Sequence, residues 1–416
     1  MRLFFPQYQS GKSRFMTWTL VHKMLSISHV FVDCQEDADL IVVSLCDVMD
    51  MWKLSGIKKT AKIPILAGGH YAFNYWSVSL LADYVWVGEI FGIIHLKTIE
   101  EIAESKHCYY SGKEAPLYSS TFIDWEMIPV CQIERNKAYY LGGVGCRNKC
   151  AFCFTSWTHA HQINTPDRIK SAHEIARKNK IHLMTVSNQY ENDNASRTKD
   201  MLLADYLKRP VSGTLVRCGI EFATCENRKR FGKPLSNEDI FKAIQKTNTD
   251  NLTLKLFHIT GYEPAEDYER YIDMLCRMFD RVHNNRLIQL EFTNLQYQNY
   301  TPLYDERWSI NHENYIDIKT TKRWYDRLRA HSARILVGAP SPFNHVACRM
   351  GVELSKDKAQ LDFWLKMIYR KDKYSKAEFY RALLDTGIFE TDKRALNFRT
   401  GEILVIKGEG FNGETA

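Results

Sequence analysis

The 416-residue sequence lacks the features that mark membrane and secreted proteins. No apolar run approaches the roughly 18 residues that a membrane-spanning helix needs. The N-terminus has no long apolar core followed by a small-residue cleavage site, so it does not resemble a secretory signal peptide. These absences predict a cytoplasmic protein without a membrane partner.

A disulfide framework is also missing, although the chain has eleven cysteines. Eight of them are scattered, and several stand in apolar surroundings, which is typical of buried reduced thiols in a reducing compartment. The formal charge of +7 is mild, so it permits a nucleic-acid partner without requiring one. The length allows two or three domains, each with its own core.

The other three cysteines, Cys146, Cys150 and Cys153, form a C-x3-C-x2-C run, with Phe152 just before the third. Zinc sites usually bring two C-x2-C pairs, and no second pair exists here. A 4Fe–4S cluster normally takes four cysteines, so three would leave one iron open to a substrate or cofactor. The alternative is three buried cysteines that lie together by chance.

The first quarter of the chain alternates strand-like and helix-like segments. Short apolar runs at 39–44, 63–67 and 84–87 predict buried parallel strands. They are followed or closed by Ser44, by Gly68 and Gly69, and by Gly88 and Glu89. Glycine at a strand's carboxyl end permits a tight turn and close approach to a ligand.

A second α/β unit is predicted from about residue 138. Strands are expected at 137–143, 181–186, 217–222, 254–260 and 287–292, and a helix at 167–179. The three-cysteine loop follows the first of these strands, where α/β barrels place their chemistry. Glu221 ends a buried strand, which is costly unless the carboxylate meets a donor or cation. This placement predicts a ligand contact or, alternatively, an ion pair with Arg217 or Lys255.

The cysteine run resembles the signature of the radical SAM superfamily. The segments around Gly219–Glu221, Lys233–Asp239, Lys255–Glu263 and Asn299–Tyr304 are similar to later motifs of that family, and residues 1–104 resemble its cobalamin-binding domain. The resemblance covers residues 1–308 and implies an α/β chain with a doubly wound, Rossmann-like parallel sheet at 1–104, a linker at 105–137 and a partial (β/α)6 barrel at 138–308. Residues 309–416 have no such signature and are predicted to form a mainly helical region.

The resemblance also implies a set of site residues. Cys146, Cys150 and Cys153 would hold a 4Fe–4S cluster. The residues that would contact S-adenosylmethionine are Phe152, Ser187, Asn188, Gly219, Glu221, Ile259 and Gly261. A face for cobalamin or substrate would comprise Ser44, Gly68, Gly69, Gly88 and Glu89. The Asp-x-His-x-x-Gly motif whose histidine binds cobalt is absent, so a domain that is only a scaffold is the alternative.

The implied chemistry is reductive cleavage of S-adenosylmethionine and hydrogen abstraction from a substrate by the 5′-deoxyadenosyl radical, with a flavodoxin- or ferredoxin-type reducing partner. No further catalytic residue is assigned. One hypothesis is rearrangement or modification without cobalamin, with an amino-acid-modified DNA base as substrate. The second is cobalamin-dependent methyl transfer. The third is a non-catalytic metal-cluster module that binds nucleic acid. Basic and aromatic residues at 365–373 and an amphipathic segment at 377–384 predict phosphate contacts or a solvated helix face.

Overall fold

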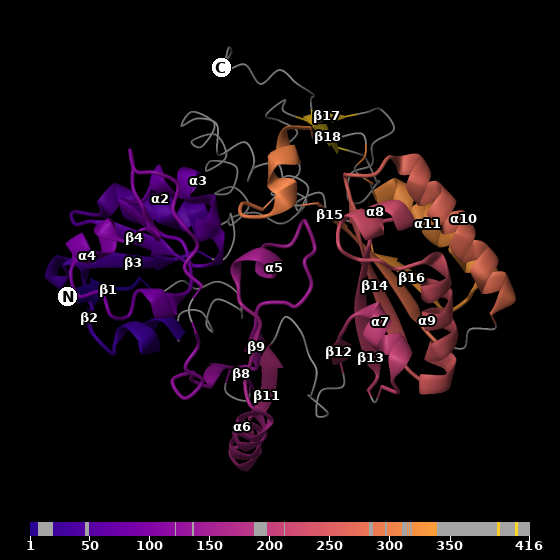
Figure 1. Cartoon of the computed structure of the whole chain (residues 1–416), viewed down its shortest axis with the longest axis horizontal. Helices are drawn as coiled ribbons and strands as arrows, with labels where there is room; N and C mark the ends of the chain where they lie inside the picture. Colours follow the sequence, from indigo (N-terminus) through magenta and orange to yellow (C-terminus); the bar gives the residue numbers. More distant parts are fainter. Residues whose placement is uncertain are drawn as a thin grey trace.

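The computed structural model describes residues 1–6, 20–45, 50–120, 122–134, 137–186, 198–211, 213–282, 286–295, 298–309, 314, 316, 318–338, 389–391 and 404–406. Two α/β bodies lie at opposite sides of the molecule, and a smaller sheet with α5 lies between them (Figure 1). The mixed α/β class with parallel sheets is thereby confirmed.

The N-terminal body is a six-stranded sheet in the order β2-β1-β3-β4-β5-β6. Its strands are parallel except for the edge strand β6, which runs antiparallel to β5. All five residues of β3 are buried, as expected of a β-branched central strand. The strands are β1 (Arg2–Phe4), β2 (Val30–Val32), β3 (Leu40–Ser44), β4 (Ile65–Gly68), β5 (Tyr84–Trp86) and β6 (Cys108–Tyr109).

Helical segments connect these strands. They are η1 (Gln35–Asp37), α2 (Asp50–Thr60), η2 (His70–Asn74), α3 (Tyr75–Ser79), η3 (Ile90–Gly92) and α4 (Ile99–Glu104). Residues 20–25 are helical as well. Leu3, Leu40 and Leu66 on the strands pack with Met24 and Ile102 in one apolar core. The three strands predicted in this region agree with β3, β4 and β5.

The middle of the chain begins with a three-stranded sheet in the order β11-β8-β7 and a two-stranded ribbon of β9 and β10. Strand β11 runs parallel to β8 in register from His182–Lys137 to Val186–Leu141. The elements are β7 (Cys131–Glu134), β8 (Lys137–Leu141), β9 (Gly143–Val144), α5 (Phe154–Thr158), β10 (Gln162–Ile163), α6 (Pro166–Lys178) and β11 (His182–Val186).

The second large body is a five-stranded parallel sheet in sequential order from β12 to β16. Within the described residues it shares no ladder with the β11-β8-β7 sheet, so closure into a (β/α)6 barrel stays a prediction. The strands are β12 (Thr198–Asp200), β13 (Leu215–Glu221), β14 (Thr253–Thr260), β15 (Ile288–Asn294) and β16 (Ile335–Gly338).

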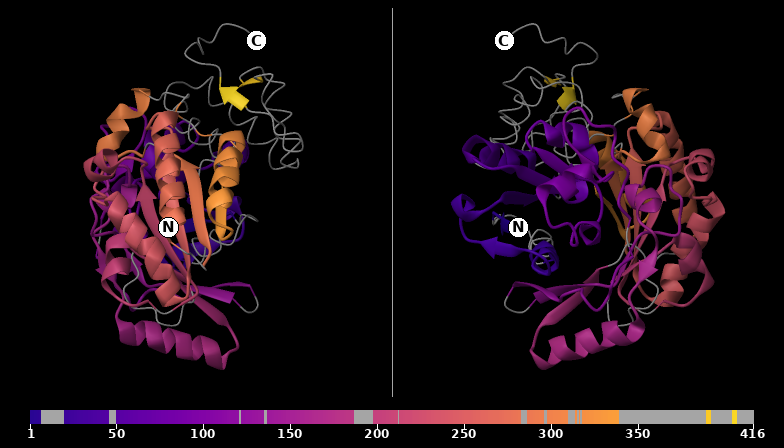
Figure 2. Two further views of the ribbon diagram at one scale, coloured as in Figure 1. Left: turned by 90° about the vertical axis from the view of Figure 1, so that its right-hand side faces the viewer. Right: turned by 60° about the vertical axis from the view of Figure 1, so that its left-hand side comes forward.

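Helices α9, α10 and α11 cover one face of this sheet (Figure 2). Along β14, for example, buried residues alternate with partly exposed residues, and the partly exposed ones lie on the other face of the sheet. Ser236 and Asp239 form a capping box at the start of α9. The helices here are α7 (Leu203–Lys208), α8 (Cys225–Arg230), α9 (Asn237–Asp250), α10 (Ala265–Arg281), η4 (Pro302–Ser309) and α11 (Ile318–His331).

Beyond residue 308 the chain continues the same sheet through α11 and β16. Strands β17 (Phe389–Thr391) and β18 (Leu404–Ile406) form an antiparallel pair. The segments 365–373 and 377–384 lie outside the described residues. Among the described helices, each is too short or too polar to cross a membrane.

Candidate active site

The three-cysteine loop follows β8 and β9 and leads directly into α5, whose N-cap is Cys153. Cys150 is buried, whereas Cys146 and Cys153 are half-buried. Burial raises the pKa of the Cys150 thiol to about 12, and the neighbouring Cys153 and Cys146 raise it too, while Lys233 lowers it. The three thiols are therefore close enough to influence one another electrostatically.

Contacts with distant segments fix the loop. Ala151 donates its backbone N–H to the Phe231 carbonyl (3.2 Å) and accepts one from Leu303 (3.1 Å). The Trp157 indole donates to the carbonyl of Cys150 at 2.9 Å. These bonds hold Ala151 and the Cys150 carbonyl, and within the loop Cys146 Sγ accepts from the Asn148 backbone N–H at 3.4 Å.

Gly145 shows why the loop begins with glycine. Its φ is 72°, in the left-handed region, and an added Cβ would lie 2.4 Å from the Ala160 carbonyl oxygen. Both facts make a larger residue costly at this position. The loop can therefore turn sharply against the chain that leaves α5.

No three His, Cys, Asp or Glu side chains within the described residues group closely enough to hold one metal ion. A 4Fe–4S cluster is different, since each cysteine binds a different iron. The three thiols of one loop, two of them half-buried, fit that donor set. We therefore retain Cys146, Cys150 and Cys153 as the candidate cluster ligands.

Glu221 lies at the carboxyl end of β13, beside this loop, and has the unusual φ of 71°. Its carboxylate is 3.1 Å from the Lys233 ammonium, and the two side chains are 12% and 13% exposed. An added Cβ on Gly219 would lie 1.9 Å from Glu221 Oε1, so glycine there makes room for the carboxylate. A strained, buried ion pair of this kind is typical of functional sites.

The two partners that the sequence suggested for Glu221 are wrong. Arg217 pairs with Asp200 across β12 and β13, and Lys255 pairs with Glu291 at 2.9 Å. Both residues lie earlier on their strands than the strand end that carries Glu221. Burial lowers the pKa of Lys233, but the Glu221 carboxylate and the cysteines outweigh it, so that the pKa is raised overall.

Lys233 is a site residue that sequence reasoning missed. The sequence showed it only as the first residue of the segment Lys233–Asp239, which is similar to a family motif. Its approach to the cysteines depends on how the chain after α8 folds back onto the loop. Gly232, with φ of 83°, permits that approach because an added Cβ would lie 2.7 Å from the Lys149 carbonyl.

The apolar candidates for cofactor contact gather beside the same loop. Phe152 meets Phe222 edge-on with 5.7 Å between ring centroids, and Ile259 packs in the same cluster. Gly261, with φ of 97°, follows β14 directly. Ser187 and Asn188 lie outside the described residues. Phe152 and Ile259 therefore share one cluster with Phe222, the residue that follows Glu221.

Glu263 holds together the segments beside this cluster, although the sequence did not assign it to the site. Its buried carboxylate accepts hydrogen bonds from the backbone N–H groups of Ala223 (2.6 Å) and Thr224 (2.9 Å). It also accepts from the Thr224 hydroxyl and from Asn227. The start of α8 is thus tied to the end of β14.

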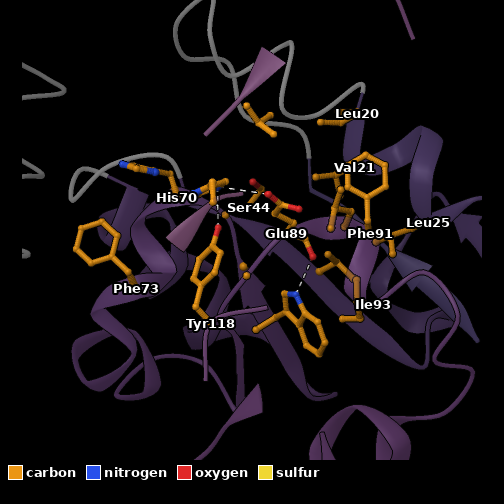
Figure 3. A pocket seen from close by; sticks show the side chains of 18 of the residues that line it. Leu20, Val21, Leu25, Ser44, His70, Phe73, Glu89, Phe91, Ile93 and Tyr118 are labelled. Carbon is orange, nitrogen blue, oxygen red and sulfur yellow. Dashed lines mark hydrogen bonds and ion pairs between the residues drawn. The ribbon is translucent and has the colours of Figure 1, made fainter. Parts of the chain in front are cut away.

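A cavity of about 350 Å³ lies between the carboxyl ends of the N-terminal strands and α5. Figure 3 shows its aliphatic and aromatic walls and the few polar groups among them. Ser44, Gly68, Gly69, Gly88 and Glu89, the predicted face, all line it. So do three residues that sequence reasoning missed, namely Tyr118, Phe154 and His159.

The glycines of this face have different roles. An added Cβ would lie 2.5 Å from the Leu45 carbonyl at Gly69 and 2.3 Å from Ser119 Cβ at Gly88, so packing within the chain explains both. At Gly68 the nearest atom would be 3.9 Å away, and this glycine only opens space. Ser44 Oγ is buried and has no hydrogen-bond partner in the described part of the chain.

A directed chain of hydrogen bonds joins the cavity to α5. The Thr158 hydroxyl donates to the Phe154 carbonyl (2.8 Å), so it must accept from His159 Nδ1 (2.8 Å). His159 Nε2 then accepts from the Tyr118 hydroxyl at 2.8 Å. Burial, followed by the charge of His70, lowers the pKa of His159 to about 4 and keeps the ring neutral. Glu89 Oε1 is 3.8 Å from the same Nε2.

No protein-family model and no curated protein sequence matches the chain. The structure of the cobalamin-dependent S-adenosylmethionine radical enzyme OxsB with aqua-cobalamin and S-adenosylmethionine bound is similar, with a TM-score of 0.51 and 11% identity over 92% of this chain and 70% of that one.

A second similar structure is that of TsrM from Kitasatospora setae, a radical S-adenosylmethionine methyltransferase with cobalamin and a 4Fe–4S cluster bound. Its TM-score is 0.48 at 10% identity, over 74% of each chain. At such low sequence identities the similarity concerns the fold alone, and the comparison with OxsB is the one that supports it. The resemblance found in the sequence is confirmed at that level.

Proposed function

We propose that this chain is a radical SAM enzyme that reductively cleaves S-adenosylmethionine at a 4Fe–4S cluster held by Cys146, Cys150 and Cys153. The observation that carries the proposal is a loop with three cysteines, one of them buried, that bonds to Phe231 beside the strained, largely buried Glu221–Lys233 pair. When bound, the cluster would supply one electron and an open iron for the cofactor.

The residues around the loop would orient that cofactor. Glu221 and Lys233 offer opposite charges to the amino, carboxylate or ribose groups, in a setting where few waters compete. Phe152 and Ile259 provide an apolar wall, and the backbone at Gly261 can lie against a flat base. These groups position the cofactor and exclude water from the reacting bond.

Cobalamin would be the second cofactor, held at the cavity beneath α5. A volume of about 350 Å³ suits the nucleotide part of cobalamin rather than its whole macrocycle, since ligand pockets span roughly 300–1,000 Å³. Ser44 Oγ offers the base a hydrogen bond, and the aliphatic walls offer it apolar contact. When bound, cobalamin would supply transfer of a methyl group to an unactivated carbon.

The second candidate is rearrangement of a substrate without cobalamin, which the missing Asp-x-His-x-x-Gly motif favours. An amino-acid-modified DNA base as its substrate stays a prediction that rests on the mild positive charge. A non-catalytic nucleic-acid-binding module would bind a cluster but would not cleave S-adenosylmethionine.

The test is anaerobic reconstitution with iron and sulfide, followed by S-adenosylmethionine and dithionite, with and without cobalamin. We expect 5′-deoxyadenosine from the wild type and almost none from Cys150→Ala. Cys276→Ala is the matched control, because Cys276 is buried in α10, on the helix-covered face of the sheet. S-adenosylhomocysteine that appears only with cobalamin supports methyl transfer.

Two results decide against parts of the proposal. Full iron content and full cleavage in Cys150→Ala would contradict the cluster assignment. A product pattern that is the same with and without cobalamin would remove cobalamin and leave the rearrangement candidate.

A further inference from the structure

Trp157 is a large aromatic side chain at the outer side of the cysteine loop. It lies in α5 and is 41% exposed, although its indole N–H donates to the carbonyl of Cys150 at 2.9 Å. The Lys149 ammonium lies 5.1 Å from the centre of its ring and donates to the Ser156 carbonyl at 2.9 Å. An exposed aromatic ring thus lies one hydrogen bond from a candidate cluster ligand.

The charges around this ring have one sign. From Arg135 to Pro166 the sequence contains no Asp or Glu, and Arg147 and Lys149 of this stretch are both exposed. The histidines of the stretch are His159, which is neutral at the cavity, and His161, which contacts Arg147 at 3.3 Å. The loop and α5 therefore present only cationic formal charge.

A second cationic segment meets the loop. Between Glu226 and Glu238 the sequence has no acidic residue, and Lys229 and Arg230 at the end of α8 are exposed. The chain just after them contacts the loop through Phe231, whose carbonyl accepts from Ala151 at 3.2 Å. Three acids contact this segment: Glu306 pairs with the exposed Arg230 at 3.1 Å, whereas Glu221 and Glu263 are largely buried against Lys233 and Asn227. The excess of positive charge remains.

We propose that Trp157, Arg147, Lys149, Lys229 and Arg230 form the docking surface for a small acidic electron-transfer protein that reduces the cluster. The inference rests on the proposed function and adds to it the place where the reductant binds. An exposed aromatic anchor within a cationic rim matches an acidic partner, because such anchors dominate interfaces and the rim steers encounter. The partner loses one electron and the cluster gains it, and no bond of this chain forms or breaks.

The experiment measures reduction of the reconstituted full-length protein in anaerobic stopped flow, with either flavodoxin hydroquinone or dithionite. We expect Lys229→Glu to lower the second-order rate constant with flavodoxin about tenfold at low ionic strength, since steering of this kind raises association rates by at least that factor. Trp157→Ala lowers it by a similar factor. Lys229→Glu keeps the wild-type rate with dithionite, which needs no docking.

Lys59→Glu is the matched control, because it makes the same charge change at an exposed site of α2 in the N-terminal body. Added salt should slow the wild type with flavodoxin and affect Lys229→Glu much less. Equal flavodoxin rates for Lys229→Glu and Lys59→Glu overturn the docking surface. If Trp157→Ala loses iron, Lys229→Glu alone decides, since its side chain is exposed.

The two proposals fail separately. If the wild type releases no 5′-deoxyadenosine with dithionite, the proposed function fails. If dithionite supports cleavage but charge reversal at Lys229 leaves the flavodoxin rate unchanged, the function stands and only the docking surface is lost.

Discussion

The Glu221–Lys233 pair allows a quantitative test of the site. We consider Lys233→Met, Glu221→Gln and the double variant. The two side chains are 13% and 12% exposed and 3.1 Å apart, so each single change leaves a largely desolvated partner without its counter-charge. Removal of one member of such a pair destabilises a protein by about 3 kcal/mol, whereas removal of both is much milder.

We therefore expect each single variant to lose about 3 kcal/mol of unfolding free energy, and the double variant to lose less than either single variant, because it leaves no charge without its partner. The control is Lys242→Met on α9. Its pair with Glu238 is 3.8 Å long with side chains 58% and 63% exposed, so its loss should stay below about 1 kcal/mol.

The assay is denaturant unfolding of the cluster-free protein, followed by tryptophan fluorescence, with the shift in midpoint compared at constant slope. Equilibrium dialysis of S-adenosylmethionine against the reconstituted protein is the second readout. We expect the double variant to recover stability but not cofactor binding, which separates a structural role from a cofactor role. A loss in Lys233→Met no larger than in Lys242→Met would refute the reasoning.

Three further predictions concern the loop and the cavity. Gly145→Ala should lower iron content after reconstitution and destabilise the protein by about 1–3 kcal/mol, because of its left-handed φ and the crowding by the Ala160 carbonyl. His159 titrates at about 4 in the fold instead of 6.5, so the unfolded chain binds the proton first. The stabilisation of about 3 kcal/mol that follows from this lowered pKa is complete above pH 6.5 and is lost as the pH falls toward 4. The measurement is the denaturant midpoint of the wild type and of His159→Asn, compared above pH 6.5 and near pH 4. Ser44→Ala should weaken cobalamin binding by up to about tenfold, and Ser44→Leu should abolish it, as measured by spectroscopic titration.

Six strands of the two bodies, β3, β4, β5, β13, β14 and β15, could be predicted because each is an apolar run, and such runs fit a buried parallel strand in any tertiary setting. Strand β3 is the clearest case, since all its residues are buried. The position of the cysteine loop after β8 followed from the same pattern. Spacing along the sequence was sufficient to predict a strand or the position of a loop wherever the structural cause is local.

The partner of Glu221 could not be predicted, because it depends on contacts between segments. Arg217 and Lys255 are the nearest cations on the same and the adjacent strand. In the register of the sheet, however, Arg217 pairs with Asp200 and Lys255 pairs with Glu291. Lys233 reaches Glu221 only because the turn at Gly232 folds onto the loop. Likewise, Tyr118 and His159 form a hydrogen bond although 41 positions separate them in the sequence, and no periodic pattern predicts this contact.

The short helix α5 connects the two sites physically. Its first residue, Phe154, contacts His70 and Phe73 at ring separations of 5.4 and 4.9 Å at the cavity, and its N-cap is Cys153 of the cysteine loop. Its last residues carry the hydrogen-bond chain to Tyr118 and the exposed Trp157. A ligand in the cavity must therefore press on the element that shapes the cysteine loop. Because packed interiors transmit strain, occupancy of the cavity should change the environment of the cluster even before any substrate binds.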